Sequence, residues 1–110
     1  MAAITNFIIE QGATFTTTVT VKASDGTAFN LTGYTPRAQM RKSYYSSTKT
    51  DFTAAIEGAA TNGQVTLSLT ATQTAAITDG RYVYDIEIDN NTSVFRVLEG
   101  MVTVSPNVTK

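Results

Sequence analysis

Residues 80–88 read Gly-Arg-Tyr-Val-Tyr-Asp-Ile-Glu-Ile, and residues 96–104 read Arg-Val-Leu-Glu-Gly-Met-Val-Thr-Val. In the first segment, Tyr82, Tyr84, Ile86 and Ile88 recur at a period of two, which indicates a β-strand with one buried face. The second segment is also strand-like, but both of its faces carry apolar residues. A strand of this kind in a small sheet has a core side and a second side that requires a partner. The pair therefore favours an assembly component over a catalyst.

The composition narrows the class of protein. A length of 110 residues fits a single domain over residues 1–110, and an apolar content of 42% is typical of a globular chain. The net charge of −1 does not resemble the basic surface of a nucleic-acid-binding protein. The chain has no Cys and no His, which removes disulfides, thiolate metal sites and the commonest catalytic base. We therefore expect no enzymatic activity, no cofactor and no nucleic-acid partner.

The N-terminal sequence and the hydropathy indicate neither export nor membrane insertion. Residues 1–6 lack a basic region and a long apolar run, so we do not expect a signal peptide. No apolar segment is long enough to cross a membrane. The sequence therefore predicts a protein without a membrane partner.

The rest of the chain reads as short strands separated by turns. Thr70 and Gln73 have the spacing of a capping box, which predicts one or two helical turns that end at Asp79-Gly80. The dipeptide Asn62-Gly63 is a hairpin signal. The expected strands lie within residues 4–9, 13–22, 37–41, 52–56, 65–69, 80–88 and 96–104. About seven strands and no long helix predict an all-β fold, an immunoglobulin-like β-sandwich with one short helical turn. Its expected core includes Phe15, Val19, Met40, Leu67, Leu69, Tyr84, Ile86 and Val102.

Three carboxylates share the outward face of the strand at 80–88. Asp85, Glu87 and Asp89 alternate with the buried residues, and Glu99 is expected close by on the next strand. Such a group could bind Ca²⁺ or serve as an acid/base pair, although no nucleophile accompanies it. The alternative, which we prefer, is a solvated acidic face paired with Arg81 and Arg96.

The polar segment 42–51 is expected to form a loop or a protruding hairpin tip. Arg41 precedes it, and the adjacent Tyr44 and Tyr45 cannot both enter one small core, because consecutive residues of an extended chain point to opposite faces. Basic residues beside tyrosines can stack nucleic-acid bases, or can form an ordinary exposed strand end. The near-neutral charge and the enrichment of Arg and Tyr in interfaces favour a protein contact through Arg41, Tyr44 and Tyr45.

The outer side of the last strand is the second candidate contact. Leu98, Val102 and Val104 already supply an inward side, so the remaining apolar residues are expected to face outward. We predict that Phe95, Val97 and Met101 are exposed in the isolated domain and bind a partner.

Several segments in the same order carry a family resemblance. They are Ile-Glu-Gln-Gly-Ala-Thr-Phe at 9–15, Asp-Gly-Thr at 25–27, Leu-Thr-Gly-Tyr at 31–34, Ala-Gln-Met-Arg at 38–41, Tyr-Val-Tyr-Asp-Ile-Glu at 82–87, Arg-Val-Leu-Glu-Gly at 96–100, and Val-Thr-Val-Ser-Pro-Asn-Val-Thr at 102–109. Together they resemble small virion structural proteins of tailed bacteriophages, many of them from phages of cyanobacteria. That family is similar to the immunoglobulin-like N-terminal domain of baseplate upper proteins. Relatives often carry Gly in the last turn, where this chain has Asp-Asn-Asn at 89–91.

The resemblance implies a role in a particle and supplies no catalytic residues. It implies a virion protein, made in the host cytoplasm, that docks on the tail or baseplate and helps to hold fibres. It also implies other virion proteins as partners and a homo-oligomeric or multicopy arrangement. A capsid decoration (cement) protein of the same fold is the alternative. A carbohydrate-binding module belongs to a different class and is less favoured, because the chain has no Trp or His.

Overall fold

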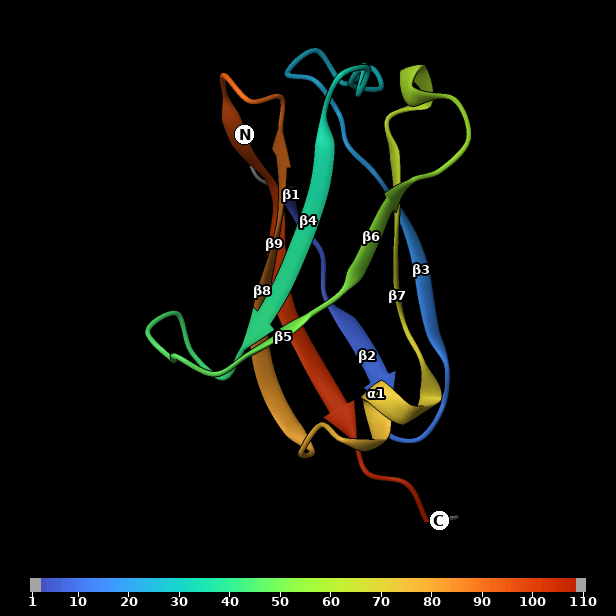
Figure 1. Ribbon diagram of the computed structural model, residues 1–110, viewed down its shortest axis with the longest axis vertical. Coiled ribbons are helices and arrows are strands. Elements are labelled where there is room, and N and C mark those ends of the chain that lie inside the picture. Colours follow the sequence, from blue (N-terminus) through green and yellow to red (C-terminus); the bar gives the residue numbers. More distant parts are fainter. Residues whose placement is uncertain (1–2, 109–110) are drawn as a thin grey trace.

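The computed structural model describes residues 3–108, which form two β-sheets packed face to face (Figure 1). Sheet A has the order β1-β9-β8-β4-β5, and β2 also pairs with β9. Its strands are β1 (Ala3–Ile4), β2 (Phe7–Glu10), β4 (Thr35–Arg41), β5 (Lys49–Asp51), β8 (Gly80–Asp89) and β9 (Val94–Ser105). Sheet B has the order β3-β7-β6, with β3 (Phe15–Thr20), β6 (Thr53–Ile56) and β7 (Gln64–Leu69). The helical segments are η1 (Ala60–Asn62) and α1 (Ala71–Ala75).

The order of the strands is that of an immunoglobulin-like sandwich. β3 pairs with β7, whereas β4, β8 and β9 belong to the opposite sheet, so the chain changes sheets repeatedly. At the corner between α1 and β8, the Tyr82 hydroxyl donates a hydrogen bond of 2.6 Å to the Thr78 carbonyl. This contact is the tyrosine corner that is typical of such sandwiches. The predicted all-β sandwich is confirmed.

The predicted helical turn is also confirmed. The Gln73 backbone N–H donates to the Thr70 hydroxyl at 3.1 Å, and the Thr70 N–H donates to the Gln73 side-chain oxygen at 2.8 Å. These two bonds form the predicted capping box. The helix carries the chain from β7 in sheet B to β8 in sheet A.

The core lies between the two sheets. Along β7, and along β8 from Tyr84 onward, every second residue is buried, as the period-two pattern predicted, and Leu67 and Ile86 are fully enclosed. Each such side chain contributes about 1.5–3 kcal/mol of burial free energy. The expected core residues are buried except for Phe15, which is half-buried and lies against Phe7 and Phe52 at the rim.

A β-bulge in β9 overturns the predicted position of Val97. Ile86 pairs with Leu98, but the next residue of β8, Glu87, pairs with Arg96, so Val97 is the extra residue. A bulge lets two consecutive residues point to one side. Val97, only 3% exposed, therefore enters the core beside Leu98, and the prediction that it faces a partner is wrong.

The same register change moves Phe95 to the inner side of sheet A. Phe95 pairs with Ile88, which is fully buried, and cross-strand partners lie on one face of a sheet. Its ring lies at the end of the sandwich, 6.2 Å from the ring of Tyr34. Phe95 is exposed, as predicted, but it lies at the open end of the core and not on the outer face.

The turn between β8 and β9 has asparagine where the family that the sequence resembles often has glycine. Asn91 has a φ of +74°, in the left-handed region that Asn tolerates better than most residues. Its backbone N–H donates a 2.7 Å hydrogen bond to the Asp89 carboxylate. The side chain of Asp89 thereby stabilises a turn that lacks glycine.

Candidate functional site: the outer face of sheet A

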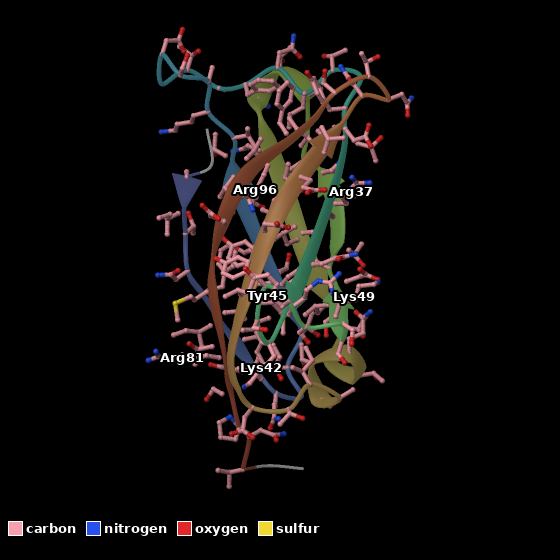
Figure 2. All side chains as sticks on the ribbon, turned by 90° about the vertical axis from the view of Figure 1, so that its left-hand side faces the viewer. Arg37, Lys42, Tyr45, Lys49, Arg81 and Arg96 are labelled. Atoms are coloured by element: carbon pink, nitrogen blue, oxygen red, sulfur yellow. The ribbon has the colours of Figure 1, made fainter. Side chains whose placement is uncertain are left out.

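The candidate site is the outer face of sheet A, defined as the side that points away from sheet B. Figure 2 looks onto this side of the molecule, with Arg37 on β4 and Arg96 on β9 marked. Because side chains alternate along a strand, the residues between the core positions all point outward here. The face has an apolar part on β1, β2, β9 and the start of β8 and a charged part that lies mainly on β4 and the rest of β8.

The apolar part consists of Ile4, Ile8, Val83 and Met101, which we call the apolar patch. Ile4 is 75% exposed, Ile8 69% and Met101 40%. Ile4 lies beside Glu99 and Ile8 beside Thr103, so both flank Met101, which pairs with Val83 on its other side. Four apolar side chains thus lie on neighbouring strands on the solvent side of the sheet.

The charged part contains a hollow of about 390 Å³. It lies between β4, β8 and the loop at residues 42–48, and its floor is formed at Ala38 and Tyr84. Its walls are formed by Arg37, Gln39, Arg41, Tyr44, Val83, Asp85 and Glu87.

Arg41 fastens the loop beside the hollow. Its Nη1 donates to the Ser46 carbonyl at 2.7 Å, and its Nη2 donates to the Gln39 side-chain oxygen at 3.2 Å. A hydrogen bond from a charged group is worth more than a neutral one, so this contact restrains the loop. Tyr44 lines the hollow and is 65% exposed, whereas Tyr45 is 98% exposed.

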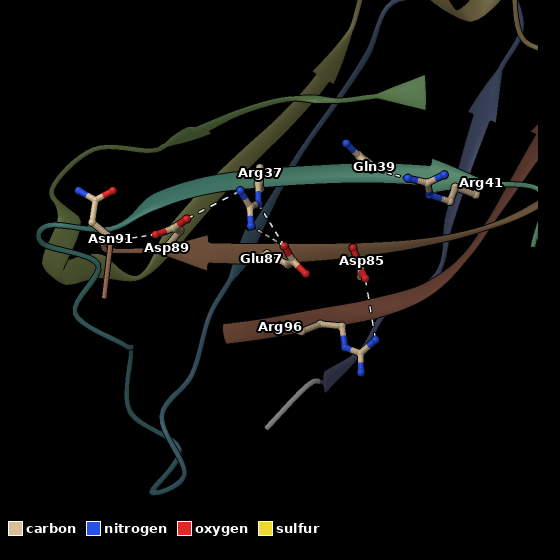
Figure 3. Close-up of polar contacts among 8 residues, drawn as sticks. All are labelled: Arg37, Gln39, Arg41, Asp85, Glu87, Asp89, Asn91 and Arg96. Atoms are coloured by element: carbon tan, nitrogen blue, oxygen red, sulfur yellow. Dashed lines mark hydrogen bonds and ion pairs between the residues drawn. The ribbon is translucent and has the colours of Figure 1, made fainter. Parts of the chain in front are cut away.

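The three carboxylates of β8 engage arginines (Figure 3). Arg37 lies 3.0 Å from Glu87 and 3.7 Å from Asp89, and Arg96 lies 3.9 Å from Asp85. The predicted pairing with Arg96 is therefore confirmed, and Arg37 takes the place expected for Arg81. Among residues 3–108, Arg81 forms no ion pair.

Ionisation differs between the carboxylates of this face. Burial, and after it the repulsion of Glu87, raises the pKa of Asp85 above its usual value, although Arg96 opposes the shift. At the neighbouring edge, a hydrogen bond from Lys49 lowers the pKa of Asp51. On the inner side of β8, burial raises the pKa of Tyr84 to about 12. Asp85 is thus an acceptor whose charge is incompletely compensated.

The carboxylates of this face do not form a metal-binding cluster in residues 3–108. Within residues 3–108, no three His, Cys, Asp or Glu side chains converge as a metal site would require. The carboxylates considered for Ca²⁺ follow one strand and lie beside Arg37 and Arg96, as in the preferred interpretation of a solvated acidic face. In the same part of the chain, no helix has the length and apolar character needed to span a membrane.

The predicted contact residues are only partly brought together. Met101 belongs to the apolar patch, Arg41 and Tyr44 border the hollow, and Tyr45 stands free on the loop. Sequence reasoning missed Ile4 and Ile8. The signal was present in the run Phe-Ile-Ile at 7–9, because three consecutive apolar residues of a strand must place one on the outer face.

Comparison with known proteins supports the fold. No family model and no curated protein matches the chain. Its fold is similar to part of InlP from Listeria monocytogenes, with a TM-score of 0.52 and 12% identity over 94% of this chain. Weaker likenesses are Dscam, at a TM-score of 0.43 and 10% identity over 94% of the chain, and a family 123 glycoside hydrolase from Clostridium perfringens, at 0.40 and 10% over 97%. The chain spans 28%, 23% and 23% of these three structures.

Proposed function

We propose that this chain is a non-enzymatic structural protein of a tailed-phage virion, an adaptor that docks on the tail or baseplate and helps to hold fibres. The observation that carries the docking role is the apolar patch, in which Ile4 is 75% exposed and Ile8 69%. The proposal that the chain belongs to a phage particle rests on its resemblance to virion structural proteins of tailed bacteriophages, carried by the segments between residues 9 and 109. The immunoglobulin-like fold is compatible with this role.

The patch has the character of a protein contact. Isolated apolar side chains are common on surfaces, but contiguous ones mark interaction sites. Covering the patch would stabilise a complex by roughly 25 cal/mol for each Å² of apolar surface removed from water. The Arg and Tyr side chains of the adjoining hollow and loop would form a polar rim of the kind that surrounds interface cores.

A capsid decoration protein would use the same patch to bind the head of the particle and not its tail. Immunogold labelling of purified particles separates the two, because the label falls on the tail in one case and on the head in the other. Failure to label any particle would contradict both.

A substitution tests whether the patch does the docking. Ile8→Asp should leave the sandwich folded, since the side chain points to solvent, but should reduce incorporation into particles at least tenfold. Thr16→Asp is the matched control, because Thr16 is exposed on the outer side of sheet B. Incorporation is measured by quantitative mass spectrometry of purified particles, and folding by circular dichroism. Equal incorporation of the two variants would show that the apolar patch does not do the docking.

A further inference from the structure

The hollow on the outer face of sheet A has the walls of a small-ligand site. Its volume of about 390 Å³ falls near the lower end of the roughly 300–1,000 Å³ of ligand pockets, which suits a ligand of one or two rings. Three separate elements line it, namely β4, β8 and the loop at 42–48. Because Arg41 fastens the loop, the walls are formed before any ligand arrives.

The charges around the hollow disfavour an ionic ligand. Arg37 and Arg41 supply two positive charges, and Asp85 and Glu87 supply two negative ones. An anion such as phosphate would lie against the two carboxylates, and a cation would lie against the two guanidinium groups. The ligand that fits both signs is neutral and carries groups that donate and accept hydrogen bonds.

Hydroxyl groups satisfy that requirement. A hydroxyl can donate to a carboxylate and accept from a guanidinium at the same time. Asp85 has spare acceptor capacity, because Arg96, at 3.9 Å, is too far away to donate a hydrogen bond to it. Arg41 commits two of its five N–H donors to the Ser46 and Gln39 oxygens, which leaves donors for a ligand.

The remaining wall is aromatic. Tyr44 from the loop lines the hollow, and Val83 adds an apolar surface. The π face of a tyrosine ring is negative and attracts weakly positive C–H groups. A pyranose ring has such C–H groups on its faces and hydroxyls on its rim.

We propose that the hollow binds one pyranose unit of a neutral saccharide, with the sugar ring against Tyr44 and its hydroxyls bonded to Asp85, Glu87 and Arg41. The groups that would bond the sugar, Asp85, Glu87 and Arg41, lie outside the apolar patch, and the hollow shares Val83 with that patch.

Amide chemical shifts measured by NMR test the proposal. The probes are the methyl glycosides of glucose, galactose, mannose and N-acetylglucosamine, each added to about 20 mM, which is enough to detect a Kd near 1 mM. Inorganic phosphate serves as the anionic probe. We expect at least one glycoside to shift amides in residues 37–44 and 83–87, and phosphate to leave them unchanged.

Adjacent tyrosines provide a matched pair of variants. Tyr44→Ala should weaken the binding of that glycoside at least about tenfold, and Tyr45→Ala should change it by less than about twofold, because Tyr45 does not line the hollow. Both residues are exposed on a loop, so both variants should fold. The proposal is overturned if none of the four glycosides shifts these amides, if phosphate alone does, or if the two variants bind equally.

Discussion

Gly100 shows how the identity of one residue is fixed by a close approach of two backbones. Between β1 and β2, the Thr5 carbonyl oxygen lies directly over Gly100, where a Cβ would overlap it. The same oxygen accepts a 2.5 Å hydrogen bond from the Tyr84 hydroxyl. Gly100→Ala would push Thr5 away and break that bond, so we expect the free energy of unfolding to fall by roughly 1–3 kcal/mol. Urea denaturation measures the change.

Tyr84→Phe separates the two contributions, because it removes the hydrogen bond and leaves the close approach intact. It should cost about 0.5–1.5 kcal/mol, less than Gly100→Ala. A Gly100→Ala protein as stable as the parent would show that Thr5 does not lie over this glycine.

Asp85 should make stability depend on pH in an unusual direction. Because folding raises the pKa of Asp85, the ionised carboxylate disfavours the folded state. The favourable contribution comes from the protonated carboxyl, so it is present at low pH and is lost as the pH rises through the folded pKa. Asp85→Asn should therefore stabilise the protein at pH 7, by at most about 0.5 kcal/mol because the group is partly exposed. The gain should disappear in acid, where Asp85 is protonated. Urea denaturation at both pH values measures it.

Asp51→Asn is the control, because its effect on stability at pH 7 should have the opposite sign to that of Asp85→Asn. The pKa of Asp51 is lowered by Lys49, so its contribution is present at neutral pH and lost as the pH falls. Finding the same sign for both variants at pH 7 would contradict the environment assigned to Asp85.

The strands illustrate what a sequence can predict at the scale of an element. The alternation in β7 and β8 and the capping box of α1 are local patterns, and both were predicted. The bulge at Val97 was not, because it depends on how β9 is matched to β8, and adjacent apolar residues fit either a bulge or a strand with two apolar faces. The candidate site was likewise predicted only where a local pattern reveals it. Met101 was recognised from its own strand, whereas the hollow requires a loop fastened by Arg41 to a neighbouring carbonyl.

At the scale of the whole molecule, the two sheets share one core, so they should unfold together. Leu67 of sheet B is completely enclosed, and Leu67→Ala should lower the free energy of unfolding by about 2–5 kcal/mol through lost burial and a cavity. None of the five tyrosines lies in β3, β6 or β7, so tyrosine fluorescence reports mainly on sheet A and its loops, whereas far-UV circular dichroism reports on both sheets.

The expected result is that both signals shift to the same lower urea concentration in Leu67→Ala, because a cooperative domain transmits a loss in one sheet to the other. Ser68→Ala, on the outer side of the same strand, should change the stability by less than about 0.5 kcal/mol. If Leu67→Ala moved the dichroism transition and left the tyrosine transition in place, the sheets would be independent units, and the shared core would not hold the outer face of sheet A in shape.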